Sequence, residues 1–198
     1  MIEIYKYIIG HPYEFSGVIF SILYVCFSIK QNILCWPALI IAAILNGYAF
    51  YLIELPLQSM MQLFFIGVGF SGWKQWNKKN TNKILVQRWS MTQTTLFSSF
   101  GLLATFILYQ GLLQLEGTSL QSKYPFFDSL IFIFNVMPMY MTTKKIIQSW
   151  LIFIAIDIVS GCFYFYTEDY FYCFLFFFYI PFATYGYLNW KKDLICKK

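Results

Sequence analysis

The sequence predicts an all-α integral membrane protein of seven transmembrane helices, and three observations support this fold class. Hydrophobic residues make up 59% of the 198-residue chain and charged residues 12%, about half the ~25% charged content of an average soluble domain. Apolar stretches of about twenty residues, each long enough to cross a hydrocarbon core of ~30 Å as a helix, recur along the whole length. In addition, two parts of the chain repeat one another.

The apolar stretches define seven predicted spans. They cover residues 13–29, 33–53, 57–76, 94–113, 124–141, 146–166 and 170–190. The glycine-rich segment 67–72 falls inside the third span rather than between a strand and a helix, so its small residues predict close helix packing and not a phosphate-binding loop.

The distribution of basic residues predicts the orientation. With an outside N-terminus, all of the fourteen Lys and Arg residues except Lys6 and Lys123 fall in inside segments, as the positive-inside rule requires. We therefore expect the C-terminus to be cytoplasmic. The net charge of +5 does not indicate nucleic-acid binding, because the basic residues form short clusters between spans rather than a stripe on a soluble face.

An internal repeat matches residues at a constant offset of 114 positions. The matched pairs are Lys30 and Lys144, Trp36 and Trp150, Tyr51 and Phe165, Glu54 and Glu168, Gly72 and Gly186, and Trp76 and Trp190. The repeat predicts one transmembrane domain over residues 1–198, in which three-helix units at about 13–76 and 124–190 are joined by a connector helix at 94–113. One connecting span makes the two units of this 3+1+3 arrangement parallel, and duplicated bundles of transporters bind substrate between the repeats near the bilayer midplane.

Asp157 is the main candidate for a functional residue. An ionised carboxylate near the middle of a span costs about 2.5 to 3.5 kcal/mol on insertion scales. At helical spacing Asp157 shares one face with Trp150, Phe153, Gly161 and Tyr164, which predicts an aromatic slot with one carboxylate and a glycine that leaves room. Such a slot suits a flat cationic ring. The alternative is that the carboxyl group binds a neighbouring helix or is protonated, while the aromatic residues only pack.

Three more residues complete the predicted substrate site. Asn46 matches Ser160 in the repeat, and it either hydrogen-bonds a sugar hydroxyl or holds two helices together. Gln62 lies in the same span as Trp73, which we also assign to the site. Ala43 matches Asp157 in the repeat, so the site should be asymmetric.

The sequence contains no catalytic constellation. Its five cysteines have no metal-ligand spacing and His11 is its one histidine. We therefore predict no enzyme activity, no cofactor and no metal site.

The sequence resembles the PnuC family of bacterial vitamin transporters over roughly residues 14–192. The motifs that carry the resemblance are Cys35-Trp36-Pro37, residues 55–65, Gly72-Trp73-Lys74-Gln75-Trp76, Lys144-Lys145, Ser149-Trp150, Tyr164 and Tyr185-Gly186-Tyr187-Leu188-Asn189-Trp190-Lys191. The nicotinamide riboside branch resembles Asn-Trp-x-x-Trp followed by Asn. This chain departs from that pattern, with Ser149-Trp150, then Phe153, then Asp157.

The resemblance implies a SWEET-like fold, a homotrimer in the bacterial inner membrane, and facilitated diffusion of a vitamin that a cytoplasmic kinase then phosphorylates and traps. We expect nicotinamide riboside as substrate, with thiamine as the alternative. Both contain a cationic ring that Asp157 would favour, whereas neutral riboflavin would gain less. A non-transport membrane scaffold or lipid-binding protein is the alternative from another class, and it predicts no solute flux.

Overall fold

The computed structural model describes residues 12–52, 56–77, 85–118, 121–168 and 170–195, and these residues form seven α-helices. The helices are α2 (Pro12–Ile29), α3 (Cys35–Leu52), α4 (Pro56–Trp76), α5 (Met91–Leu113), α6 (Pro125–Thr143), α7 (Gln148–Tyr166) and α8 (Tyr170–Ile195). Each helix overlaps one predicted span, so the predicted number and order of the helices are confirmed. Lys6, His11 and Glu54, named above, lie outside the described ranges. So do five of the lysines that the predicted orientation places inside, namely Lys78, Lys79, Lys83, Lys197 and Lys198.

Local sequence signals explain where the helices begin. Pro12, Pro56 and Pro125 are the first residues of α2, α4 and α6, where a missing N–H and a fixed φ are tolerated. At α5, the Ser90 side chain accepts a hydrogen bond from the Gln93 backbone N–H, and the Gln93 side chain accepts one from the Ser90 N–H. This capping box starts α5 earlier than the hydrophobic pattern alone predicts.

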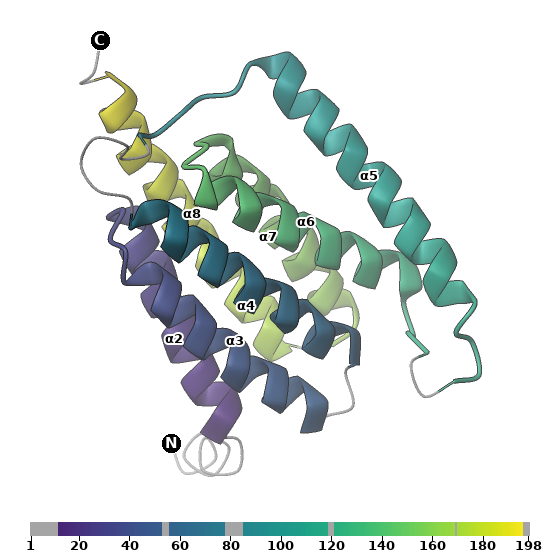
Figure 1. Cartoon of the computed structure of the whole chain (residues 1–198). Coiled ribbons are helices and arrows are strands. Elements are labelled where there is room, and N and C mark those ends of the chain that lie inside the picture. Colours follow the sequence, from purple (N-terminus) through teal and green to yellow (C-terminus); the bar gives the residue numbers. More distant parts are fainter. Residues whose placement is uncertain (1–11, 53–55, 78–84, 119–120, 169, 196–198) are drawn as a thin grey trace.

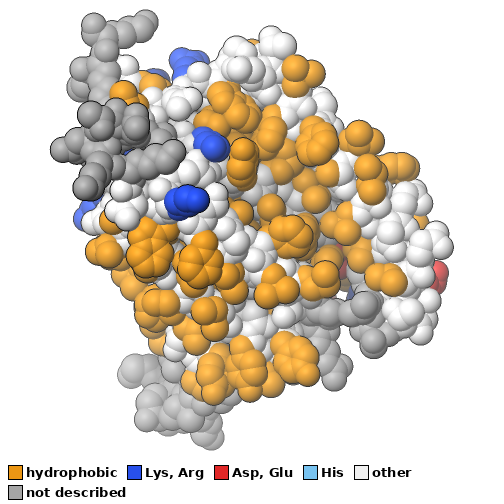
Figure 2. Space-filling view, viewed as in Figure 1, with side chains coloured by type: hydrophobic (Ala, Val, Ile, Leu, Met, Phe, Trp, Pro, Cys, Tyr) orange, Lys and Arg blue, Asp and Glu red, His pale blue; other side chains and the backbone are white. Residues whose placement is uncertain are grey.

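The surface of the bundle is apolar. Four helices, α3, α5, α6 and α7, are long and apolar enough to cross a membrane, and α2 contains a shorter apolar helix, Phe15–Ile29. Hydrophobic side chains cover much of the face seen in Figure 2, while the Lys and Arg side chains visible there gather toward its upper left. Since a soluble monomer rarely exposes a contiguous apolar surface of this size, we conclude that the helices face lipid.

Six helices form a closed ring. In order around the ring, α2 packs against α3, α3 against α4, α4 against α6, α6 against α7, α7 against α8, and α8 against α2. Helix α5 packs against α6 outside the ring and diverges from the other helices toward its amino-terminal end (Figure 1). Helices α2–α4 and helices α6–α8 therefore meet at two seams, α4/α6 and α8/α2.

Residues that match in the sequence repeat have matching conformations in the turns that precede α3 and α7. Gln31 and Lys145, which are 114 positions apart, both have a φ of 52°. In the first turn the Asn32 N–H donates to the Phe27 carbonyl at 2.9 Å, and in the second the Ile146 N–H donates to the Met141 carbonyl at 3.1 Å. The two turns are therefore built in the same way.

Matching contacts also join α3 to α4 and α7 to α8. A Cβ atom added to Gly72 would lie 2.5 Å from the Trp36 indole, and one added to Gly186 would lie 2.7 Å from the Trp150 indole. Only glycine at these positions lets the helix backbone approach the ring so closely. Residues that match in the sequence repeat therefore also pack in equivalent ways in the structure.

Candidate substrate-binding site

A cavity of about 210 Å³ lies inside the ring, and all six ring helices contribute to its lining. The share of one water molecule in the liquid is ~30 Å³, so the cavity has room for a small organic molecule. No described residue of α5 lines it. The cavity therefore depends on how the two sets of three helices pack against each other.

The structure brings six of the seven predicted site residues to this cavity. They are Trp150, Phe153, Asp157 and Tyr164 of α7, Asn46 of α3 and Gln62 of α4. These four residues of the predicted stripe on α7 therefore face inward over about four turns of the helix.

Trp73, the seventh predicted residue, does not line the cavity and is 40% exposed. The described residues of α4 that line the cavity are Gln58, Met61, Gln62 and Phe65. Beyond Phe65 the inward-facing space is filled by the Trp36 indole, which packs against Gly72. Trp73 is therefore not among the predicted residues that the structure brings to the cavity, because the cavity ends before α4 does.

Gly161, the glycine of the predicted stripe, packs against α8. A Cβ atom at this position would lie 2.9 Å from the Phe177 ring of α8, and Gly161 is not among the cavity-lining residues. The glycine leaves room for a neighbouring helix rather than for a substrate.

The Asp157 carboxyl group lies beside the cavity and is 5% exposed. Within the described part of the chain, no hydrogen bond or ion pair to this group is found. The phenol of Tyr179 also lines the cavity. The alternative in which a neighbouring helix holds the carboxyl group by a hydrogen bond is thus not what the structure shows.

The cavity lining contains one carboxyl group and no basic side chain among its described residues. The carboxyl group belongs to Asp157, and none of the described lining residues is Lys, Arg or His. Ala43, which matches Asp157 in the repeat, lines the cavity too. The site is asymmetric because one half places a carboxyl group where the other places a methyl group.

Polar side chains from several helices line the cavity together with Asp157. Asn46 donates to the Ser21 hydroxyl at 3.2 Å, and Asn135 donates to the Ile131 carbonyl at 2.7 Å. Gln58 and Gln62 have no hydrogen bond to another residue that the structure describes. The two glutamine amides are therefore available to hydrogen-bond a solute.

An unpaired indole N–H adds another donor. The Trp150 side chain is 4% exposed and its Nε1 has no partner among the described residues. A buried donor without a partner costs about 1–3 kcal/mol. A solute with an acceptor close to Trp150 would recover part of that cost.

Tyr24 and Tyr179 line the cavity, although the sequence analysis did not identify them. In α8 the described lining residues Tyr172, Leu175, Phe176, Tyr179 and Ala183 follow helical spacing. That spacing is the signal that could have indicated the lining face of α8.

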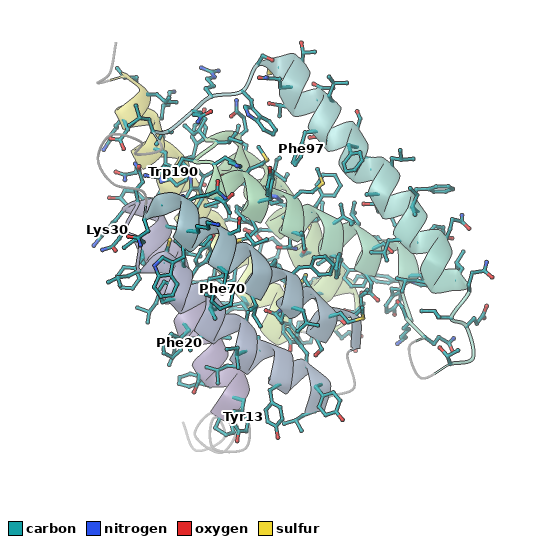
Figure 3. All side chains as sticks on the ribbon, viewed as in Figure 1. Tyr13, Phe20, Lys30, Phe70, Phe97 and Trp190 are labelled. Atoms are coloured by element: carbon teal, nitrogen blue, oxygen red, sulfur yellow. The ribbon has the colours of Figure 1, made fainter. Side chains whose placement is uncertain are left out.

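Tryptophan residues pack together at the end of the cavity nearest the lysines. The labels Lys30 and Trp190 locate this end in Figure 3. The Trp76 Nε1 donates to the Thr143 carbonyl at 3.0 Å, and the Trp190 Nε1 donates to the Ser28 carbonyl at 3.1 Å. The first bond joins α4 to the carboxyl-terminal end of α6, and the second joins α8 to the carboxyl-terminal end of α2. The two indole rings are 6.3 Å apart, so together they seal this end.

A buried lysine reinforces the same seal. The Lys145 ammonium lies 4.5 Å from the centre of the Trp76 ring and donates to Gln31 Oε1 at 2.9 Å. The Gln31 amide in turn donates to the Asp193 carboxylate. We define the basic end of the bundle by Lys30, Trp76, Lys145 and Trp190, and the opposite end is called the far end.

The ring of lipid-facing helices around a partly polar cavity defines a multi-pass membrane protein with an internal cavity of the size of a small solute. Residues 11–192 match the model of the family described as nicotinamide mononucleotide transporter. The chain belongs to this family, and the predicted resemblance to PnuC proteins is confirmed.

Two curated relatives are the nicotinamide riboside transporters PnuC of Escherichia coli (strain K12) and of Shigella flexneri. Each is 27% identical over 139 residues, which covers 59% of this chain and 58% of the relative. The match thus spans less than two thirds of the length of these relatives.

A solved structure described as the crystal structure of the vitamin B3 transporter PnuC has a similar fold. Its TM-score is 0.77 at 17% identity, and the superposition covers 98% of this chain and 87% of that chain. The seven-helix architecture is therefore that of a known transporter structure.

Proposed function

We propose that this protein carries nicotinamide riboside across the membrane through the cavity inside the six-helix ring. The observation that carries the proposal is the unpaired Asp157 carboxyl group beside a cavity whose described lining has no basic side chain. Nicotinamide riboside contains a positively charged aromatic ring and a neutral sugar. The carboxylate is the counter-charge for the ring, and the cation offsets the cost of holding that carboxylate in a low-dielectric site.

The walls of the cavity suit both parts of this solute. Phe153 lies about one turn and Trp150 about two turns before Asp157 on the same helix face, where their rings can attract a cationic ring. Gln58 and Gln62 of α4 supply amides without partners in the described chain. These amides are the groups we assign to the sugar hydroxyls.

The same proposal includes the 3+1+3 arrangement and the SWEET-like character of the fold. The units at about 13–76 and 124–190 would be parallel repeats, with the 94–113 helix as connector. The matching turns at Gln31 and Lys145 support this division, as does the position of α5 outside the ring. Transport would then occur by rocking of one unit against the other at the α4/α6 and α8/α2 seams.

The cellular setting is also part of the proposal. We place the protein in the bacterial inner membrane with its N-terminus outside and its basic end in the cytoplasm. We propose a homotrimer and facilitated diffusion, made one-way by a cytoplasmic kinase that phosphorylates the vitamin. A phosphorylated product carries negative charge, and a cavity with Asp157 and no described basic lining residue would not readmit it.

Thiamine is the second candidate substrate, because it too contains a cationic aromatic ring that Asp157 would favour. Riboflavin is neutral and should bind more weakly. A titration of the purified protein with each vitamin, followed by quenching of tryptophan fluorescence, tests the proposal. We expect saturable quenching by nicotinamide riboside at the lowest concentration, and no saturable response to any of the three would refute it.

A further inference from the structure

A second, much smaller pocket lies where the amino-terminal turns of α4 and α6 meet. Its volume is about 10 Å³, and it is lined by Leu57, Gln58, Met61, Asp128, Ile131 and Phe132. Of these, Gln58, Met61 and Ile131 also line the large cavity. Because the same three side chains form a wall of both spaces, they are the partition between them. A volume near that of one water probe makes the small pocket a constriction and not a binding site.

The constriction lies at the far end of the bundle. Leu57 is in the first turn of α4 and Asp128 is in the first turn of α6, whereas the tryptophan seal lies at the opposite ends of these helices. The Phe64 and Phe132 rings meet edge to face at 5.4 Å across the seam. Met61 and Gln58 are long, flexible side chains, so this partition is easier to displace than the hydrogen-bonded seal at the basic end.

Asp128 places a carboxyl group at this constriction. Its carboxylate accepts a hydrogen bond from the Ser122 hydroxyl, and within the described residues it has no ion pair. The adjacent Lys123 directs its ammonium over the Tyr124 ring, 5.3 Å from the ring centre. A carboxylate at the surface would be enough to stabilise the start of α6 through the helix dipole. Asp128 instead faces a pocket between α4 and α6.

Acidic side chains visible on one face of the molecule lie away from the basic end. Figure 2 shows acidic atoms toward the right side of the view, whereas the Lys and Arg side chains visible there gather at the upper left.

We propose that the substrate cation passes between α4 and α6 at the far end, and that Asp128 is the first carboxylate it meets before Asp157. This inference rests on the proposed function. A negative charge at a narrow mouth raises the local concentration of cations and favours their entry over that of anions. Asp128 thus sets the charge preference of entry, while Asp157 sets that of binding.

The test is the initial rate of nicotinamide riboside uptake by full-length protein in liposomes at about 10 mM and about 1 M salt, where the screening length is ~30 Å and ~3 Å. We expect Asp128→Asn to raise KM about fivefold at low salt, to leave the maximal rate unchanged, and to match wild type at high salt. Glu116→Gln removes an exposed charge in the loop after α5 and should change KM less than twofold.

Two further variants separate charge from structure. Ser122→Ala removes the hydroxyl that binds Asp128 and should keep the wild-type KM, and Asp128→Glu should also keep it. If Asp128→Asn does not reach the membrane, Leu57→Lys adds the opposite charge to the same pocket and should raise KM at low salt.

Equal KM values at low salt for wild type, Asp128→Asn and Leu57→Lys would overturn the inference. A rise in KM for Ser122→Ala equal to that for Asp128→Asn would overturn it as well, because loop position and not charge would then be responsible. Failure of the wild-type protein to take up the vitamin is a different outcome, and it would refute the proposed function instead.

Discussion

Replacing Asp157 by asparagine should weaken binding of a cationic vitamin while making the empty protein more stable. The substitution keeps the shape of the side chain and removes its charge. Asp157 is 5% exposed and no hydrogen bond to it is found within the described residues, so the empty protein bears a large part of the cost of burying a carboxyl group. A neutral amide of equal size lowers that cost.

The magnitude follows from the dielectric environment. Two unit charges about 4 Å apart interact with ~4 kcal/mol at an effective dielectric constant of ~20. Part of this is lost to desolvation of the cation, so we expect a net loss of about 2 to 4 kcal/mol, which is a 30- to 1000-fold weaker affinity. Neutral riboflavin should lose much less, because its binding does not depend on a counter-charge.

The assay combines a fluorescence titration with thermal unfolding in detergent, with Glu116→Gln as the matched control because this exposed side chain lies away from the cavity. Asp157→Asn should unfold at a higher temperature than wild type without ligand, and it should gain little on adding nicotinamide riboside. An Asp157→Asn variant that binds nicotinamide riboside with wild-type affinity would refute the counter-charge reasoning.

Three other predictions follow from the packing. Trp150→Phe should weaken vitamin binding about tenfold or more in the same titration, whereas Trp73→Phe should leave it unchanged because this indole lies outside the cavity; equal effects would contradict the site. Gly72→Ala should destabilise the protein by about 1–3 kcal/mol in thermal unfolding, because its Cβ would lie 2.5 Å from an indole ring, while Gly67→Ala, with nothing within 4 Å, should not. Ser90→Ala should cost about 0.5–2 kcal/mol through loss of the α5 cap, and unchanged stability would show that the cap is dispensable.

The helices and the cavity-lining face of α7 were predictable because their signals are local. Apolar length specifies a span, and the spacing from Trp150 to Asp157 specifies one helix face. The repeat was informative for the same reason, since equal offsets in sequence became the equal glycine contacts at Gly72 and Gly186.

The rest of the site depended on contacts between helices. The chain has 16 Tyr and 23 Phe residues, so spacing alone does not separate Tyr179, which lines the cavity, from aromatic residues that face lipid. Spacing along α4 does not show that Trp73 lies beyond the cavity, because Trp36 from another helix occupies the space next to Gly72. The fold could therefore be predicted from the sequence. The position at which the cavity ends on each helix, and the place at which it opens, could not.

The most direct test of the account is flux of labelled nicotinamide riboside into liposomes that contain the wild-type protein, with no ion gradient across the membrane. We predict saturable uptake that equilibrates across the bilayer, that unlabelled vitamin inside accelerates, and that Asp157→Asn reduces at least tenfold. Uptake no faster than in protein-free liposomes would contradict it.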